Sequence, residues 1–225
     1  MSFVKRILLV GGALASLAAM ANTPSRSGRP SSNDVQCANL VYAGNKTSTC
    51  FSDRFLTRLR EETNIQTQPV LTRAFLGKKD LFNYPFAVMT GEGAYTLTPG
   101  ERINLRYYVT HGGFLVASSS CSDPEWTRSF RSEMGRVFPD MKMKVVPLSH
   151  PIYRTVYTID STHTIHNHTG ANLEALSYQG RIVVVFSADG LNDTAHTQGC
   201  CCCGGDELDR AEYINVNILA YALLH

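Results

Sequence analysis

Three short, uniformly apolar runs dominate the hydrophobic pattern of this chain. They are PFAVM at 85–89, FLVA at 114–117 and IVVVF at 182–186. Runs of this length, bounded by Pro, Gly or polar residues, are typical of buried strands. None of them alternates between apolar and polar positions, which indicates that both faces of each strand are covered. The pattern therefore predicts three interior strands of one sheet.

Helical patterns separate these runs. Thr98, Pro99 and Glu101 predict a helix start with a capping box. Its expected apolar face consists of Ile103, Leu105, Tyr107, Tyr108 and Val109. Asp123-Pro124 predicts a second start, and the stripe of that helix is Trp126, Phe130, Met134 and Val137. Ser52 is expected to cap an earlier helix, and residues 208–224 form the last one.

Alternation of strands and helices predicts an α/β domain. Further strands are expected at 69–76 and 141–148, and a hairpin is expected around Gln179-Gly180. A strand, helix, strand unit joins parallel neighbours, and buried parallel strands need helices on both faces. We therefore predict a single three-layer α/β domain with a mostly parallel central sheet.

The first residues have the pattern of a secretory signal peptide. Lys5 and Arg6 precede an apolar run that ends in Ala19-Met20-Ala21. An uncleaved membrane anchor is the alternative interpretation. Cleavage would give a signal peptide at 1–21, a disordered linker at 22–34 and one α/β domain at 35–225, with no transmembrane segment left. The mature protein is then expected to be exported, to the periplasm or the extracellular space.

Composition narrows the set of partners. The 225 residues are 44% hydrophobic and 18% charged, as in an ordinary globular protein. The formal net charge is only +2, and no cluster of Lys or Arg stands out. Nucleic acid is therefore not an expected partner.

Seven cysteines lie after residue 21, and an oxidising compartment favours disulfides among them. A Cys37–Cys50 disulfide closing the intervening loop is expected, with two reduced buried thiols as the alternative. The four consecutive residues Cys200, Cys201, Cys202 and Cys203, here called the cysteine run, are hard to explain by packing. Two or three of them with His196 suit a soft or borderline ion such as zinc or copper(I). Disulfide pairing, within the run or with Cys121, is the alternative.

Candidate catalytic residues follow the predicted interior strands. Ligands gather beyond the carboxyl ends of strands in open α/β sheets, where Glu92, Cys121 and His196 are expected. Cys121 lies between a strand and a helix start, where amides and the helix dipole lower a thiol pKa. A nucleophilic Cys121 would use His196 or His150 as its base. Structural alternatives are a disulfide for Cys121 and a solvated turn for Glu92. The polar loop at 161–171 contains three histidines, His163, His166 and His168. They are either metal ligands or ordinary exposed residues.

Several segments together resemble a known family of exported bacterial proteins. They include DLFNYPFAVMTGEG, LTPGERINLRYYVTHGGFLVASSSC, EWTRSFRSEMGRVFP, PLSHPIYRTVY, GRIVVVFSADGLNDTAHTQGCCCCGG and INVNILAYALLH. They resemble the domain-of-unknown-function family numbered 4159 across nearly all of the chain after the linker. The resemblance implies a flavodoxin-like or class I glutamine amidotransferase-like fold, also related to ThuA-like proteins, and no settled activity. The amidotransferase Gly-x-Cys-x-Gly signature is absent, because residues 119–123 read Ser-Ser-Cys-Ser-Asp.

Two functional hypotheses remain open at this point. The first is a non-catalytic exported binding or interaction module with a cysteine-rich loop at the ligand edge of the sheet. The second is a thiol- or metal-dependent hydrolase centred on Cys121, His196 and Glu92. In both, the loop GLNDTAHTQGCCCCGG is expected over the carboxyl edge of the sheet, with at least one cysteine of the run near Cys121.

Overall fold

The computed structural model describes residues 31, 33–200 and 205–225. The predicted signal peptide (1–21) and most of the predicted linker (22–34) lie outside the described residues. So do three members of the cysteine run, Cys201–Cys203.

A seven-stranded sheet runs through the centre of the domain in the order β2-β1-β3-β4-β7-β6-β5. Neighbouring strands pair in parallel from β2 through β1, β3 and β4 to β7. Strands β6 and β5 pair antiparallel and form one edge of the sheet. The bounds are β1 Cys37–Val41, β2 Thr72–Phe75, β3 Phe86–Gly91, β4 Phe114–Ser119, β5 Lys144–Val145, β6 Leu173–Tyr178 and β7 Arg181–Ser187. The predicted mostly parallel sheet is confirmed.

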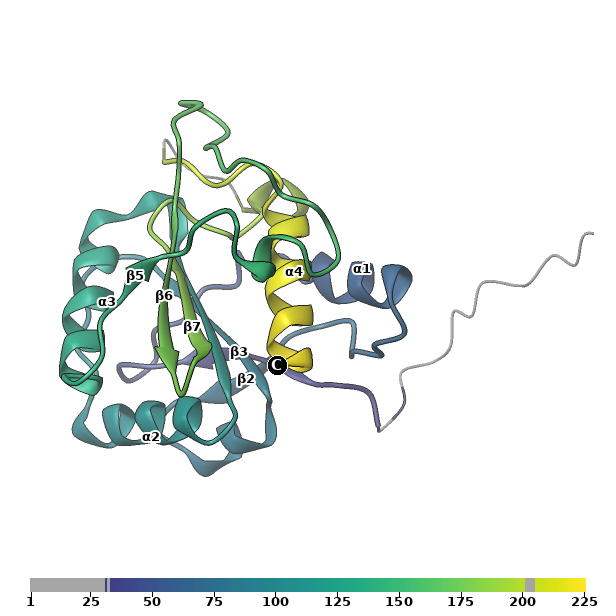
Figure 1. Ribbon diagram of the computed structural model, residues 1–225. Helices are drawn as coiled ribbons and strands as arrows, with labels where there is room; N and C mark the ends of the chain where they lie inside the picture. The colour runs from purple at the N-terminus through teal and green to yellow at the C-terminus, as the bar shows by residue number, and fades with distance from the viewer. Residues whose placement is uncertain (1–30, 32, 201–204) are drawn as a thin grey trace, which may run out of the picture.

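Four α-helices cover the two faces of the sheet. They are α1 Arg54–Glu62, α2 Pro99–Thr110, α3 Pro124–Val137 and α4 Ala211–Leu224. One core layer lies between the sheet and α1 with α4, and the other lies between the sheet and α2 with α3 (Figure 1). Four short 3₁₀ turns complete the elements: η1 Lys79–Asn83, η2 Ser120–Ser122, η3 Pro151–Tyr153 and η4 Thr194–His196. The domain is therefore the expected three-layer α/β arrangement.

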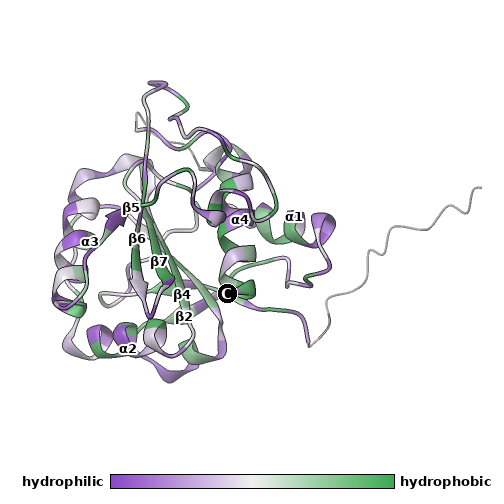
Figure 2. Ribbon diagram, viewed as in Figure 1, coloured by the Kyte–Doolittle hydropathy of each residue, from purple (hydrophilic) through white to green (hydrophobic). Residues whose placement is uncertain are grey.

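The apolar runs became the interior strands because both faces of the sheet are covered. Every residue of β3 and β4 is buried, and β4 lies between β3 and β7. Val88, Val116 and Val185 are neighbours across these three strands. The same strands appear in hydrophobic colours in Figure 2, with polar residues on the outer sides of α2 and α3. Among the described residues, no helix is long and apolar enough to cross a membrane.

Two predicted helix starts and the hairpin are confirmed. Thr98 and Glu101 form a complete capping box at α2. Asp123 caps α3 through Oδ1, which accepts hydrogen bonds from two backbone amides of the first turn at 2.8 Å. Gln179 and Gly180 both have positive φ, 50° and 81°, as a two-residue hairpin turn requires.

Two details of the predicted helices are wrong. Ile103 and Tyr107 of α2 are 70% and 50% exposed, because one side of this helix is enough to cover its part of the sheet. Helix α1 begins at Arg54 after Asp53, so Ser52 is not its N-cap residue. The buried Ser52 hydroxyl accepts a hydrogen bond from the Arg54 amide at 3.3 Å instead.

Candidate functional site

The strand order creates a crevice between the ends of β1 and β3. The chain leaves β1 towards α1 on one face of the sheet and leaves β3 towards α2 on the other. Loops that diverge in this way open the crevice in which α/β proteins bind ligands. A cavity of about 320 Å³ lies there, lined by Tyr42, Lys46, Thr47, Ser48, Thr49, Gly91 and Glu92. We call this cavity the crevice.

The loop after β1, residues 42–53, is held in place along its length. Tyr42 and Lys46 exchange two backbone hydrogen bonds of 2.9 and 2.8 Å, which close a tight turn. The amide of Ala43 donates to Glu101, the capping-box residue of α2, at 2.7 Å. Further along, Asn39 donates to the Ser48 carbonyl at 2.7 Å. These hydrogen bonds therefore fix the loop that forms one wall of the crevice.

Tyr42 forms the inner end of the crevice. Its hydroxyl donates to the Thr90 carbonyl at 3.1 Å and accepts from the Trp126 indole at 2.6 Å. Burial raises the pKa of Tyr42 to about 12, so this hydroxyl remains a neutral donor. A Cβ on Gly91 would lie 2.5 Å from the same oxygen, which explains why glycine ends β3.

Across the crevice, Lys46 meets the loop after β3. Its Nζ donates to the Glu92 carbonyl at 3.0 Å. The Glu92 side chain is exposed at the rim, and neither Cys121 nor His196 lines the cavity. Glu92 is thus a crevice residue, as its position after a strand predicted, but it is not part of a shared pocket with the other two proposed catalytic residues.

A buried polar network lies behind the crevice, centred on Asn192. Its Nδ2 donates to Thr90 Oγ1 and Ser120 Oγ, both at 3.1 Å, and to the Cys50 carbonyl at 3.0 Å. Its Oδ1 accepts from the Ser118 hydroxyl. Asn192 is 1% exposed, so these bonds have no competition from water. One side chain therefore joins β3, β4 and the loop after β1.

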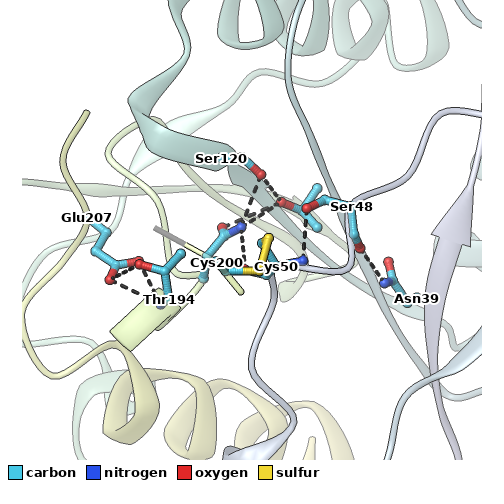
Figure 3. Close-up of a disulfide and its surroundings, with 9 residues drawn as sticks. Asn39, Ser48, Cys50, Ser120, Thr194, Cys200 and Glu207 are labelled. Carbon is cyan, nitrogen blue, oxygen red and sulfur yellow. Dashed lines mark hydrogen bonds between the residues drawn. A yellow bond between two sulfur atoms is a disulfide. The ribbon is translucent and has the colours of Figure 1, made fainter. Parts of the chain in front are cut away.

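A disulfide reinforces the same connection. Cys50 is bridged to Cys200, with Cα atoms 5.5 Å apart and a sequence separation of 150. Figure 3 shows this bridge next to Ser48 and Ser120. The predicted Cys37–Cys50 disulfide is wrong, because Cys37 is a fully buried thiol in β1, on the α1 and α4 face. Burial raises the pKa of Cys37 to about 12.

The described parts of the loop between β7 and α4, residues 188–200 and 205–210, lie over the carboxyl edge of the sheet as predicted. Besides Asn192, the Leu191 amide donates to Ser118 at 2.7 Å. Asp206 exchanges hydrogen bonds with the Ser122 hydroxyl at 2.7 and 3.0 Å. A Cβ on Gly205 would overlap the Cys121 carbonyl, so the backbone at Gly205 packs directly against that of Cys121.

Cys200 is not available to the predicted metal site of two or three cysteines of the run with His196. Cys200 is oxidised in the bridge to Cys50 and so lacks the thiolate that metal ligation needs. A disulfide was the alternative for the run, but the partner is Cys50 and neither Cys121 nor another member of the run. Cys201, Cys202 and Cys203 lie outside the described residues, and their predicted role as metal ligands stays a prediction.

Cys121 has an unusual backbone at the predicted strand-to-helix junction. It has φ 52° and ψ 33°, and Ser122 also has a positive φ of 54°. Such left-handed residues other than glycine are uncommon and cluster at functional sites. Cys121 is half-buried.

His196 lies with two carboxylates. Its Nδ1 is 2.7 Å from Asp193 Oδ1, and Glu212 at the start of α4 completes a group whose ligand atoms all lie within 4.8 Å. Burial raises the pKa of Asp193, although its hydrogen bond to His196 opposes this effect. Glu212 is missing from the sequence-based candidates, because it reads as an ordinary acidic residue in the first turn of a helix.

The histidine-rich loop is fastened by Asp206. This buried carboxylate accepts backbone hydrogen bonds from His166 at 2.9 Å, Asn167 at 3.1 Å and Glu207 at 3.0 Å. His163, His166 and His168 are all exposed. Burial alone would raise the pKa of Asp206, but the amide donors outweigh it and hold that pKa well below its usual range.

Asp206 predicts a pH-dependent stability. A carboxyl whose folded pKa is depressed stabilises the fold above its unfolded pKa of about 3.9, and this contribution is lost as pH falls towards the folded value. We therefore expect urea unfolding to give a higher free energy of unfolding for the wild-type protein than for Asp206→Asn. This difference should be full above about pH 5 and should become smaller below about pH 4. A free-energy difference that stays constant from pH 7 to pH 3 would contradict a stabilising charge on Asp206.

Comparisons with known proteins identify the family to which the chain belongs. The search of curated proteins found no match. A family model described as "Domain of unknown function (DUF4159)" matches residues 36–223, which span all seven strands and nearly all of α4. The chain therefore belongs to this family.

Proposed function

We propose that this protein is an exported, non-catalytic binding module whose ligand site is the crevice. Two features support export: the signal-like pattern at 1–21 and a disulfide, which persists in oxidising compartments. The strand order is compatible with the flavodoxin-like and amidotransferase-like scaffolds that the sequence resembles.

The observation that carries the proposal is a polar cavity at the point where the strand order reverses. Its lining offers the Lys46 amine, the Glu92 carboxylate and the hydroxyls of Thr47, Ser48 and Thr49. This set suits a small polar solute with both hydrogen-bond donors and acceptors, such as a zwitterion or a polyol. Because hydrogen bonds and a disulfide already fix the loop, little ordering is needed on binding.

Lys46 should be required for ligand binding. In a thermal-shift screen of amino acids, sugars and sugar acids, a ligand present at one hundred times its Kd should stabilise the wild-type protein by about 2.7 kcal/mol. For a domain of this size that corresponds to about 5–10 °C in Tm. Lys46→Ala should lose most of this shift, because its amine lines the site.

The matched control is Lys79→Ala, which removes an exposed lysine from η1. It should keep the full shift. Equal shifts in the two variants would show that the compounds bind elsewhere and would contradict the proposal.

The alternative function, a thiol-dependent hydrolase, has one supporting observation, the left-handed backbone of Cys121. The same screen separates the two functions. A binding module with Cys121→Ala should still be stabilised by the ligand, and the wild-type protein should leave the ligand chemically intact. Turnover of the ligand that stops in Cys121→Ala would favour the hydrolase.

A further inference from the structure

A second polar cluster lies outside the crevice, where the loop after β7 meets the start of α4. Asp193 and His196 come from that loop, and Glu212 comes from the first turn of the helix. One ligand atom from each of these side chains lies within 4.8 Å of the others. Two consecutive elements of the chain thus bring an imidazole and two carboxylates to one point.

Asp193 supplies an independent sign of a missing partner. The residue is only 9% exposed, and its Oδ1 is already bonded to the His196 ring. Its Oδ2 is inaccessible to solvent and has no hydrogen-bond partner among the described residues. The nearby Ser52 hydroxyl lowers the pKa of Asp193, against the effect of burial. A buried carboxylate oxygen left unpaired pays the full cost of desolvation without a compensating bond.

Two arginines share Glu212 and limit what can bind there. Arg58 Nε lies 3.0 Å from Glu212 Oε1, and Arg54 lies 3.6 Å from Oε2. The Arg54 side chain is 46% exposed, so this longer contact can open towards solvent. The shorter Arg58 contact orients the carboxylate, as outer partners of metal ligands commonly do. Glu212 is therefore already paired with two guanidinium groups, and the exposed Arg54 is the one that a bound ion would displace.

We propose that Asp193, His196 and Glu212 bind one divalent transition-metal ion, with water completing its coordination. One imidazole nitrogen and two carboxylate oxygens suit Zn²⁺, which takes three protein ligands and a water in open sites. The ion would pair the orphaned Asp193 oxygen, and the exposed edge of His196 provides its entry path. This site is separate from the crevice and does not depend on the proposed ligand.

The test uses the full, oxidised protein after removal of metal by dialysis against EDTA. Titration with ZnCl₂ in a calorimeter should show one ion bound per chain. Asp193→Asn and His196→Ala should each weaken binding at least ~10-fold, because the first removes the negative charge of a ligand and the second removes the imidazole. His111→Ala, which removes an exposed histidine at the end of α2, should leave the affinity unchanged. Circular dichroism of the metal-free variants confirms that each is folded.

Cobalt substitution distinguishes this site from the cysteine run. Co²⁺ bound by nitrogen and oxygen should show no thiolate-to-metal charge-transfer absorption. The proposal is overturned if no stoichiometric Zn²⁺ binds, if both ligand variants keep wild-type affinity, or if a charge-transfer band assigns the ion to cysteines.

Discussion

Removal of the Cys50–Cys200 bridge should lower the free energy of unfolding by about 2–5 kcal/mol. The bridge closes a loop across 150 positions, so its loss releases much conformational freedom in the unfolded chain. The variant to measure is Cys50→Ala with Cys200→Ala, which leaves no Cys200 thiol to pair elsewhere. Urea unfolding at pH 7 gives the free-energy difference.

Cys37→Ala is the matched control, because Cys37 is a buried thiol outside the bridge. It should cost less than the double variant. Peptide mapping without reductant should link the peptide that holds Cys50 to the one that holds Cys200. A link between Cys37 and Cys50 would contradict the structure.

Asn192→Ala should lower the free energy of unfolding by about 3 kcal/mol. The change removes the acceptor of the buried Ser118 hydroxyl and a donor to the Cys50 carbonyl, and leaves Thr90 and Ser120 only their hydrogen bond to each other. Each group left unsatisfied costs about 1–3 kcal/mol. Asn45→Ala removes an exposed asparagine from the loop after β1 and should change stability by less than about 0.5 kcal/mol.

The Asn192 variant should also affect the crevice. Its amide bonds the Cys50 carbonyl, so the variant loses one of the contacts that hold the end of the loop that carries Lys46, and the Cys50–Cys200 bridge remains. A destabilisation under about 1 kcal/mol would show that water replaces the amide and that the network does not hold the site together.

Local sequence patterns predicted most of the fold. The apolar runs at 85–89, 114–117 and 182–186 became β3, β4 and β7, because interior parallel strands need apolar residues on both faces. Caps at Thr98 and Asp123 were equally local signals, since each depends on residues within one helical turn. The exposed Ile103 and Tyr107 show where the pattern failed, because an apolar residue at the margin of a stripe need not be covered.

The candidate site was predictable only in part. Glu92 was found because it follows an apolar strand, but Lys46 and Ser48 carry no local signal for a site. They belong to the crevice because β1 lies between β2 and β3, and strand order depends on contacts between distant segments. The partner of Cys50 was missed for the same reason, since proximity in the sequence favoured Cys37 over Cys200.

The most direct test of the binding-module proposal is to map by amide NMR where small polar compounds bind to the oxidised protein. The account predicts shift changes concentrated at residues 46–49 and 91–92, which line the crevice. These changes should disappear in Lys46→Ala and persist in Lys79→Ala. Shift changes centred on Cys121 or His196, or none from any compound, would contradict it.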